Sequence, residues 1–473
     1  MSESNIPLCV DLDGTLTPAD TLHESLLGLA RQAPLRLFYL ISWAFKGKAF
    51  FKHEVASRVT LDAGVLPIRQ DLWQWIKSER AGGRRIVLAT AADRKVADEV
   101  ARHLEIFDEV AASDGKTNLS GANKRKALVE RFGEKGFDYV GNDMRDIDPW
   151  RSSRKAIVVG SPHIVERARR VAEVAKVFPT ARAGAATWLR AMRLHQWAKN
   201  ALIFLPGLLA HQILTPPTLI ASVLAFFAFG LCASSVYLIN DLLDLNSDRH
   251  HRRKRERPFA AGVLSARGGL LAAAALLTAS AIIGACITWQ FCLVLLAYYV
   301  ITWSYSLRLK RTALVDVMTL AGLYTMRIVA GAAATAIPLS FWILAFSVFM
   351  FLSLAIVKRY TELYEGIQAG KQGGHGRGYS AEDLPLLLSL GTASGYCTVV
   401  VMALYINSTD SQVLYHHHKP LWLSCPLLLY WISRVWLLTT RGKMHDDPVV
   451  FALRDRVSII VLALLGASVM VAI

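Results

Sequence analysis

Charged residues are scarce in this sequence, and apolar residues are abundant. Asp, Glu, Lys and Arg make up only 19% of its 473 residues, whereas 53% are hydrophobic. A disordered chain shows the opposite balance, so disorder is excluded for most of the length. Long apolar runs dominate from about residue 200 onward, while residues 1–190 alternate charged and apolar stretches as a soluble domain does. We therefore expect two bodies of different kinds, the second one embedded in lipid.

Cysteine is also scarce and is not arranged as a framework. The six cysteines include no Cys-x-x-Cys pair and no Cys/His spacing that indicates zinc. They fall in apolar segments, which predicts buried free thiols rather than disulfides. The N-terminus lacks a basic region followed by a long apolar core, so we expect no cleavable signal peptide and a cytoplasmic N-terminal domain.

Acidic residues are outnumbered by basic ones, 37 against 53, which gives a formal net charge of +16. No nucleic-acid-binding motif, internal repeat or low-complexity tract accompanies this charge. We attribute the excess to membrane topology and to phosphate binding, and we expect no nucleic acid among the partners.

The second body is predicted to be a helical membrane domain. Its apolar segments have about the length that a hydrocarbon core of ~30 Å requires, and the short ones would be tilted. Connections rich in Lys and Arg alternate with connections nearly free of them. The positive-inside rule then places the N-terminal domain in the cytoplasm and the C-terminus outside a bacterial-type plasma membrane. The nine predicted spans are 200–214, 217–239, 269–287, 289–307, 314–336, 339–357, 385–406, 420–438 and 457–473.

An acidic stripe lies where the second predicted span meets the cytoplasm. Asn240, Asp244 and Asp248 are four residues apart, so on a continuing helix they stack on one face, and Asp241 borders that face. Such carboxylates repel one another unless a cation holds them, and Mg²⁺ commonly bridges a few carboxylates to substrate phosphates. The alternative is a solvated helix end paired with neighbouring arginines. Acids at bilayer depth are costly and mostly functional, which favours the metal site.

Cations at the cytoplasmic ends of several spans add anion receptors. Arg327 differs from the others because it lies inside the predicted span 314–336, where an arginine needs a partner or a water-filled cavity. Together with the acidic stripe, these cations predict a cavity that faces the cytoplasm and takes a phosphoester or diphosphate. The predicted phosphate-binding residues of this domain are Lys199, Arg257, Lys310, Arg327 and Lys358.

These motifs resemble a known family. The pattern NDxxDxxxD at 240–248, followed by Arg-Pro at 257–258, is similar to that of the UbiA superfamily of intramembrane prenyltransferases. The resemblance covers about residues 190–473. Within the superfamily it points to the decaprenyl-phosphate phosphoribosyltransferase branch, through stretches such as YSLRLKR at 305–311. It implies nine helices around a lipid-accessible cavity, Mg²⁺ as cofactor, phosphoribosyl diphosphate (PRPP) as donor and a polyprenyl phosphate as acceptor.

The chain departs from most of that superfamily in a second acidic region. Those enzymes carry a second aspartate cluster, whereas only Asp316 occupies the region here, with Thr312 four residues earlier. The missing carboxylate fits PRPP as donor better than a prenyl diphosphate clamped by two acidic motifs. Two alternatives stay open: an aromatic prenyltransferase that consumes a prenyl diphosphate, and a non-catalytic lipid-binding or transport protein.

The N-terminal domain opens with an apolar strand that runs into the motif DLDGT at 11–15. A carboxylate at a strand end can attack a phosphoryl group, and a second one two residues later can act as general acid and base. The glycine permits the sharp turn away from the strand. Three further elements follow in order: a strand that ends in Thr90, then Lys124 after a glycine-containing turn, and a strand that ends in Asn142, Asp143 and Asp146.

This order of elements resembles the haloacid dehalogenase (HAD) superfamily of phosphatases over about residues 5–175, with an α/β Rossmann-like fold and a small helical cap. In the fourth motif Asn142 stands where the family commonly has an acid, and Asp143 would replace it only if the loop shifts. The resemblance implies Asp11 as nucleophile, Asp13 as acid and base, Thr90 and Lys124 as phosphate-binding residues, and a Mg²⁺ site formed by Asp11, Asp13 and Asp146.

The predicted cap spans residues 21–60, and its stretch LRLFYLISWAFKGKAFF is unusually apolar. Two interpretations stay open for this stretch. It is either the buried core of the cap or an interfacial segment that leans on the membrane.

Taken together, these features predict a bifunctional membrane enzyme. We place a HAD-like phosphatase domain at 1–178, a linker at 179–192 and a UbiA-like transmembrane transferase domain at 193–473. The phosphatase would hydrolyse a phosphoester, and the fusion suggests the 5-phosphate of the transferase product. The predicted partners are a polyprenyl phosphate, PRPP and the bilayer, and Mg²⁺ is the predicted cofactor of both domains.

Overall fold

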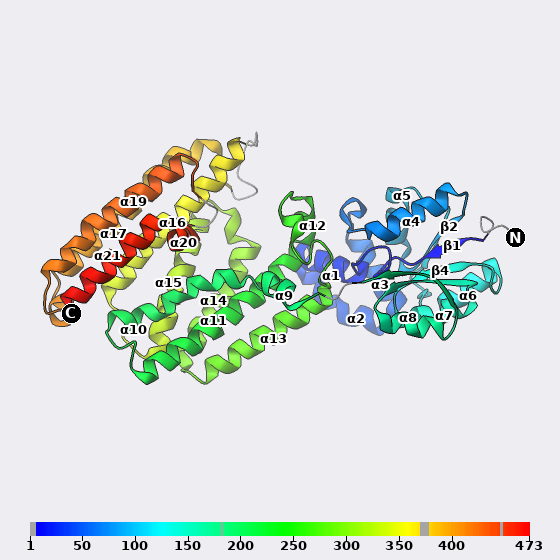
Figure 1. Ribbon diagram of the computed structural model, residues 1–473, viewed down its shortest axis with the longest axis horizontal. Helices are drawn as coiled ribbons and strands as arrows, with labels where there is room; N and C mark the ends of the chain where they lie inside the picture. Colours follow the sequence, from blue (N-terminus) through cyan, green and yellow to red (C-terminus); the bar gives the residue numbers. More distant parts are fainter. Residues whose placement is uncertain (1–5, 181–182, 369–377, 445–447) are drawn as a thin grey trace. The chain divides into compact units, whose positions relative to one another are not determined.

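The computed structural model describes residues 6–180, 183–368, 378–444 and 448–473 (Figure 1). By its internal contacts the chain divides into two units. The first contains Met1–Met192 and Tyr237–Ala273, and the second contains Arg193–Val236 and Ala274–Ile473. The segment 237–273, which carries the acidic stripe, therefore groups with the N-terminal region by its contacts.

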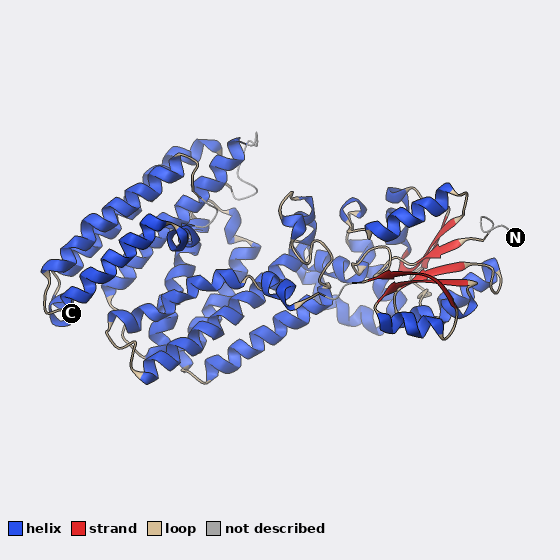
Figure 2. Ribbon diagram, viewed as in Figure 1, coloured by secondary structure: helices blue, strands red, loops and turns tan. Residues whose placement is uncertain are grey.

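The first unit is built on a six-stranded sheet in the order β3-β2-β1-β4-β5-β6, and every strand pairing is parallel (Figure 2). This arrangement confirms the predicted α/β fold of the N-terminal region. Chain order reverses between β1 and β4, which creates a switch point at the carboxyl ends of these two strands. The strands are β1 Leu8–Val10, β2 Ile86–Asp93, β3 Glu109–Ser113, β4 Asp138–Gly141, β5 Lys155–Gly160 and β6 Glu173–Pro179.

Helices cover both faces of this sheet. Successive side chains of a strand point to opposite faces, so Leu8 and Val10 join one buried apolar cluster and Cys9 joins another. A strand buried on both faces must be apolar along its whole length, which explains the continuous run before Asp11. The helices that pack on the sheet are α4 Gln70–Ala81, α5 Arg94–Leu104, α6 Ala122–Phe132, α7 Ile147–Ser152 and α8 Pro162–Arg169.

A small helical subdomain is inserted between β1 and β2. It has its own apolar core around Leu29, Trp43, Val55 and Val59. Asp20 begins it by accepting hydrogen bonds from the first backbone amides of its first helix. Its elements are α1 Thr21–Gln32, the 3-10 helix Pro34–Tyr39, α2 Leu40–Phe45 and α3 Lys48–Arg58.

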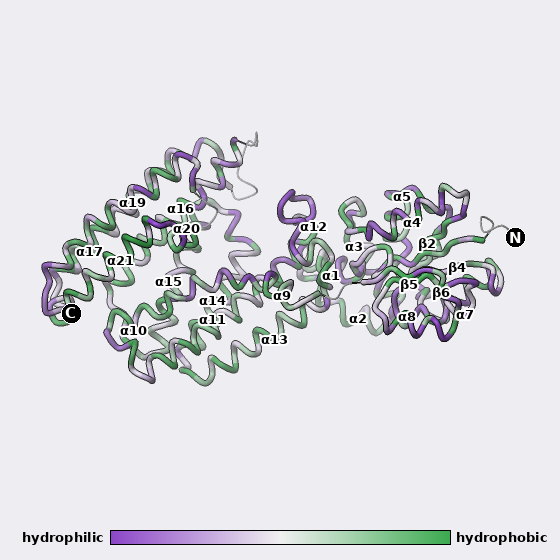
Figure 3. The backbone as a smooth tube through the Cα atoms, viewed as in Figure 1, coloured by the Kyte–Doolittle hydropathy of each residue, from purple (hydrophilic) through white to green (hydrophobic). Residues whose placement is uncertain are grey.

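The described residues include seven helices that are long and apolar enough to cross a membrane, or eight if a bent pair counts as one span. They confirm a helical membrane domain, and Figure 3 shows their predominantly hydrophobic colouring. The seven are α11 Pro216–Leu243, α13 Ala266–Ala285, α14 Trp289–Leu307, α15 Val315–Thr335, α16 Phe341–Gln368, Ala381–Ile406, which includes α17 Leu384–Ile406, and Lys419–Thr440, which includes α19 Ser424–Thr440.

Two of the nine predicted spans, 200–214 and 457–473, are not among these seven helices. The segment 200–214 holds the end of a 3-10 helix, Leu194–Phe204, and the short helix α10 Leu205–Leu209. Pro206 lies in the first turn of α10, a position where a helix does not need the backbone N–H that proline lacks. The same lack of an N–H prevents one continuous helix from running through this position. The segment 457–473 forms α21 Arg456–Ala472, which is bent by 79° from α20 Pro448–Arg454.

The bend before α21 has a local cause. Asp455 lies between the two helices in an extended conformation, and its carboxylate accepts a hydrogen bond from the Ser458 amide. An aspartate in this position starts a new helix rather than continuing the previous one. The prediction of nine uninterrupted spans was therefore wrong at 200–214, and α21 counts only together with its bent neighbour.

The second unit has its core around α15 and α16, whose buried residues form one large apolar cluster. Small residues let α15 approach other segments closely. At Gly331, an added Cβ would lie 2.1 Å from the backbone oxygen of Ile203, so only glycine fits there. Such close contacts are the usual means of helix association where lipid removes the hydrophobic driving force.

Candidate functional site

The first candidate site lies at the switch point of the sheet. Val10 pairs with Leu88 on one side and with Val140 on the other, so the residues that follow these positions meet at one edge. The Asp11 amide donates a hydrogen bond to the Val140 carbonyl at 3.0 Å, which continues the pairing to the motif itself. The strand ends thus bring together residues that are far apart in the sequence.

A buried network joins the predicted catalytic residues at this edge. Lys124 donates from Nζ to Asp11 Oδ1 at 2.8 Å and to the Tyr139 hydroxyl at 2.7 Å. Tyr139 in turn donates to Asp146 Oδ1 at 2.8 Å. All four side chains are buried. The negative charges of Asp11 and Asp146 raise the pKa of the Lys124 ammonium in spite of its burial, so Lys124 stays protonated.

The Asp146 carboxylate also holds the turn that follows β4. Its second oxygen, Oδ2, accepts hydrogen bonds from the amides of Asn142 at 2.8 Å and Asp143 at 2.9 Å. These bonds fix the turn after β4, and no sequence pattern had assigned Tyr139 as the bridge between Lys124 and Asp146. Thr90 is fully buried within β2, which continues to Asp93 rather than ending at Thr90 as predicted, and it accepts a hydrogen bond from the Ala92 amide at 3.0 Å.

The structure separates the two candidates in the fourth motif. The Asn142 carboxamide accepts a hydrogen bond from the Thr15 hydroxyl at 2.9 Å. It also lies so close to Gly14 that an added Cβ there would be 2.3 Å from Asn142 Nδ2. Asp143 is exposed and instead caps the 3-10 helix Met144–Asp146. Asn142, and not Asp143, therefore faces the loop that holds Asp11 and Asp13.

The two aspartates of DLDGT have unusual acidities. Burial raises the pKa of the Asp11 carboxyl to about 6, although the charge of Lys124 opposes the rise. Burial raises the pKa of the Asp13 carboxyl to about 7, and the negative charges of Asp20 and Asp11 add to the effect. Asp13 also accepts a hydrogen bond from the Thr21 amide at 2.8 Å. A carboxyl that titrates near neutrality can both donate and accept a proton.

The helical subdomain adds Lys52, which the sequence analysis did not assign. From α3, Lys52 Nζ donates to the Ala91 carbonyl at 2.6 Å and to Asn118 Oδ1 at 3.0 Å, directly beside Thr90. Its neighbour His53 contacts the Asp93 carboxylate at 3.0 Å. In the sequence, Lys52 and His53 stand out only as a polar pair after an apolar segment. The packing of α3 against β2 is what brings both side chains to the end of the strand.

The second candidate site is the acidic stripe. One guanidinium nitrogen of Arg257 contacts Asp241 Oδ1 at 3.1 Å and Asp248 Oδ2 at 2.6 Å. Both aspartates are buried, and burial raises the pKa of the Asp248 carboxyl although Arg257 opposes the rise. The two carboxylates, seven residues apart, thus share one face and converge on one cation.

Asp244 lies between those two aspartates in the sequence, at a helix boundary. Helix α11 ends at Leu243, and α12 Leu245–His250 begins one residue later, with Asp244 at the break. The Asp244 carboxylate contacts Arg31 of α1 at 3.4 Å. The Asp244 amide donates to the Asn240 carbonyl at 2.9 Å, and the Asp248 amide donates to the Asp244 carbonyl at 2.8 Å, so helical hydrogen bonding runs across the boundary. The face of Asn240, Asp244 and Asp248 stays a prediction, and the contact of Asp241 and Asp248 with Arg257 adds to it.

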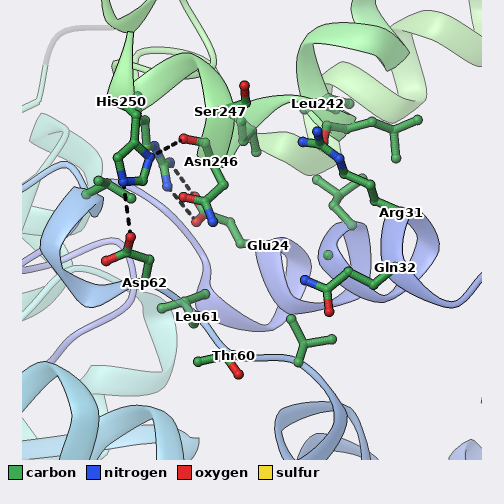
Figure 4. A pocket seen from close by; sticks show the side chains of 17 residues that line it. Glu24, Arg31, Gln32, Thr60, Leu61, Asp62, Leu242, Asn246, Ser247 and His250 are labelled. Atoms are coloured by element: carbon green, nitrogen blue, oxygen red, sulfur yellow. Dashed lines mark hydrogen bonds and ion pairs between the residues drawn. The ribbon is translucent and has the colours of Figure 1, made fainter. Parts of the chain in front are cut away.

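A second ion pair binds α1 to the residues after the stripe. Arg249 makes two hydrogen bonds with the Glu24 carboxylate, at 2.6 and 2.7 Å, and both side chains are largely buried. His250 contacts Asp62 at 3.3 Å. Polar and apolar side chains, among them Glu24, Asp62 and His250, line a cavity of about 340 Å³ (Figure 4). No local sequence pattern predicts this arrangement, because Glu24 and Arg249 are 225 positions apart in the chain.

In the second unit, Arg327 has partners that explain its burial. Its Nε donates to Asn200 Oδ1 at 3.1 Å. The guanidinium also lies 5.2–5.6 Å from the ring centroids of Phe229, Tyr298 and Tyr324. Lys199, likewise buried, lies over the same Tyr324 ring at 5.4 Å. Arg327 thus satisfies the predicted need for a partner through Asn200 and aromatic faces.

Asp316, the acid of the second acidic region, is fully buried and bound to Arg359. The Tyr305 hydroxyl donates to Asp316 Oδ1 at 2.8 Å, and Arg359 Nη2 donates to the same oxygen at 3.0 Å. This carboxylate is therefore neutralised within the protein. The remaining predicted cations, Lys310 and Lys358, are half-buried in the 3-10 helix Leu309–Arg311 and in α16.

The donor sets fit Mg²⁺ to different degrees. In the described part of the chain no three His, Cys, Asp or Glu side chains gather as a closed metal cluster. Mg²⁺, however, is usually held by one or two carboxylates together with substrate phosphates. Asp241 and Asp248 already reach a single cationic atom, so their oxygens suit such an ion. At the sheet edge, Asp11 and Asn142 face the same loop, and Asp146 is engaged by its own turn.

Known proteins that are similar to this chain match its membrane region. The sequence profile described as the UbiA prenyltransferase family matches residues 201–464. An uncharacterized protein, y4nM, from Sinorhizobium fredii is 38% identical over 99% of this chain and 92% of its own length. The decaprenyl-phosphate phosphoribosyltransferase of Mycobacterium tuberculosis is 29% identical over 57% of this chain and 88% of its own length.

A solved structure is also similar. It is a UbiA homolog from Archaeoglobus fulgidus bound to DMAPP and Mg²⁺, which is 20% identical to this chain. The similarity covers 60% of this chain and 99% of the other, with a TM-score of 0.46.

Proposed function

Because this chain belongs to the UbiA prenyltransferase family, we propose that its membrane region transfers 5-phosphoribose from PRPP to a polyprenyl phosphate. The observation that carries this choice is the distribution of carboxylates. Asp241 and Asp248 converge on one position, whereas Asp316 is neutralised by Arg359. One pair of carboxylates that converges on a single position suits one diphosphate, and the relationship to a phosphoribosyltransferase supports PRPP as its carrier.

The proposed reaction displaces diphosphate from a sugar. An oxygen of the polyprenyl phosphate attacks the anomeric carbon of PRPP, the bond from that carbon to the diphosphate oxygen breaks, and inorganic diphosphate leaves. Mg²⁺ bound by Asp241 and Asp248, with Asn240 and Asp244 beside them, would neutralise charge on the leaving diphosphate. Arg257 already contacts both carboxylates and holds them in place, and it is available to bind phosphate oxygens.

The cations of the second unit have different proposed roles. Lys199, Lys310 and Lys358 are proposed to bind substrate phosphates. Arg327 is proposed as a positioning residue, because its guanidinium is engaged by Asn200 and enclosed by aromatic rings. Its effect on substrate would then pass through Asn200 and Tyr324, which Lys199 also contacts.

The N-terminal region, residues 1–178, is proposed to be a HAD-type phosphatase. Asp11 attacks the phosphorus of a phosphoester and forms a phospho-aspartate, while Asp13 donates a proton to the leaving oxygen. Asp13 then accepts a proton from the water that hydrolyses the intermediate. Lys124 holds Asp11 in position, and its charge with the Thr90 hydroxyl would bind the phosphate oxygens. Mg²⁺ at the predicted site of Asp11, Asp13 and Asp146 would offset phosphate charge, and Asn142 faces the same loop.

Mass spectrometry tests the transferase. Membranes that contain the protein are given PRPP, Mg²⁺ and a polyprenyl phosphate, and the lipid product is weighed. We expect the wild type to convert the polyprenyl phosphate to a lipid that is heavier by one phosphoribosyl group. We also expect a second product, which is this lipid after the loss of one phosphate. Transfer of a prenyl group from its diphosphate to an aromatic acceptor, with PRPP untouched, would establish the aromatic prenyltransferase instead. No turnover of either donor would favour a lipid-binding or transport protein.

A further inference from the structure

The apolar stretch of the helical subdomain divides into two groups of side chains. One group forms the core of the subdomain, with Trp43 and Leu29 buried and Leu37, Leu40 and Phe50 packed against them. The other group is exposed, although Tyr39 still stacks on Trp43 with its ring centroid 6.1 Å away. The exposed members, with the exposed fraction of each, are Leu35 at 77%, Phe38 at 81%, Tyr39 at 59%, Ile41 at 70% and Phe45 at 88%.

This exposed surface is unusual for the region that carries it. Between residues 6 and 180 seven large apolar side chains are exposed, and five of the seven lie between Leu35 and Phe45. We call these five side chains the apolar tip. Single exposed apolar residues are normal, whereas a contiguous patch marks a surface that binds something.

The charged residues within the chain segment that carries the apolar tip are all basic. No Asp or Glu occurs between Glu24 and Glu54, whereas five cations do. Among these, Arg36, Lys46 and Lys48 are exposed beside the tip. A short amphipathic segment with aromatic and aliphatic residues and a basic rim is the usual composition of an interfacial membrane anchor. Anionic lipid head groups complement such a rim.

A second copy of the chain fits this surface less well. In a two-fold symmetric contact the same patch meets itself, so the basic rims would face each other and repel. The chain itself carries membrane-spanning helices, and a bilayer is therefore always present at a high local concentration. Charge and availability both favour lipid as the occupant.

We propose that the apolar tip, Leu35–Phe45 with its basic rim, docks into the anionic surface of the bilayer in which the chain is anchored. The five side chains would enter the head-group region to a depth of about 5–10 Å, the depth of other interfacial helices. Helix α3, which follows the tip, carries Lys52 to the Ala91 carbonyl beside Thr90. Docking would therefore hold the Asp11 site next to the head groups, where a lipid phosphoester is exposed; only this consequence rests on the proposed function.

A fluorescence experiment on the full chain tests the docking. Exposed Cys286 and Cys397 are first replaced by serine, and this parent gives the background signal. Phe45→Cys is then labelled with bimane, and the protein is reconstituted into nanodiscs of neutral lipid or of neutral and anionic lipid. Lys126→Cys is the matched control, because Lys126 is exposed on α6 of the same region.

With anionic lipid we expect nitroxide-labelled lipids to quench the bimane at position 45 at least twofold more than the bimane at position 126. Iodide in the water should show the reverse order. The triple variant Leu35→Ser, Phe38→Ser and Ile41→Ser should restore iodide access at position 45. Because lipid contact and not turnover is measured, this result is independent of whether the phosphatase assignment is correct.

Three results would overturn the proposal. Equal iodide access at positions 45 and 126 in both lipids would mean that the tip stays in water. Protection that appears only at high protein concentration, with cross-links between copies at position 45, would make a second copy the occupant. Protection that is equal in nanodiscs and in a lipid-free polymer, with no quenching by labelled lipids, would mean that the rest of the chain covers the tip.

Discussion

Both candidate sites bring two carboxylates close together, and they differ in which parts of the chain supply the residues. Each holds a pair of carboxylates around one cation, Lys124 between Asp11 and Asp146 and Arg257 between Asp241 and Asp248. At the sheet edge the three residues come from three separate elements, whereas at the stripe all three lie within residues 241–257. The first site therefore depends on the sheet being assembled, and the second depends mainly on how one helix ends.

This contrast separates the effects of mutations. A change at the sheet edge should affect hydrolysis alone, and a change at the stripe should affect transfer alone. The largest effect is expected for Asp11→Asn, which removes the nucleophile. Phosphoester hydrolysis should fall by at least about 10³-fold, as for other enzymes without their nucleophile, while transfer from PRPP stays within about twofold. The measurement is phosphate release together with product mass in the same membranes.

Asp143→Asn is the matched control for that variant, because Asp143 is exposed and caps the 3-10 helix Met144–Asp146. It should keep hydrolysis near the wild-type rate. Strong hydrolysis by Asp11→Asn, or a large loss in Asp143→Asn, would contradict the arrangement of the sheet-edge site.

The next effect concerns the stripe. Asp248→Asn removes one of the two carboxylates that converge on Arg257, and we expect transfer from labelled PRPP to fall by about 100-fold, the scale of losing one electrostatic contact in a reacting site. Asp244→Asn should cost less than about tenfold, since Asp244 lies at the helix break and contacts Arg31. If the two variants are equally impaired at saturating Mg²⁺, the stripe works as the continuous face that its spacing predicts.

A smaller effect is expected from pH. Hydrolysis needs Asp11 ionised, and its pKa is about 6, so the rate should rise through pH 6. It needs Asp13 protonated, and with a pKa of about 7 the rate should fall above pH 7. Outside this window the rate should change by about tenfold per pH unit. Initial rates between pH 4.5 and pH 9 test the profile, and a flat rate from pH 7 to pH 9 would exclude Asp13 as the acid.

The smallest effect is a structural one. Arg249→Glu places like charges opposite Glu24 and should destabilise the first unit by about 3 kcal/mol, the usual cost of breaking a buried ion pair. The unfolding temperature should fall by roughly 2–4 °C for each kcal/mol. The double variant Glu24→Arg with Arg249→Glu should recover much of the loss. Thermal unfolding monitored in detergent measures it, and no recovery in the double variant would show that the pair is not a specific contact.

Much of both regions could be predicted from spacing. The strand before Asp11, the order of the motifs after it and the α/β class follow from local patterns, because a strand buried on both faces must be continuously apolar. The apolar lengths likewise predicted most of the membrane helices. The predicted metal set held Asn240, Asp241, Asp244 and Asp248, with Arg257 as a phosphate-binding residue, and it did not predict that Asp241 and Asp248 would contact Arg257. The span at 200–214 was wrong because apolar composition does not record that Pro206 starts a separate short helix.

What the sequence alone determined is therefore the kind of each body and the identity of the polar residues in its motifs, since hydrophobic period and motif spacing are local properties. Only the tertiary structure decided which of those residues meet. The position of Asn142 over Gly14 and the bridge from Lys124 through Tyr139 to Asp146 depend on strand register. The contact of Asp241 and Asp248 with Arg257 depends on the path of the chain after α11. Such contacts join elements that are far apart in the sequence. Their distance in space is set by packing, which cannot be read from any single residue or local pattern.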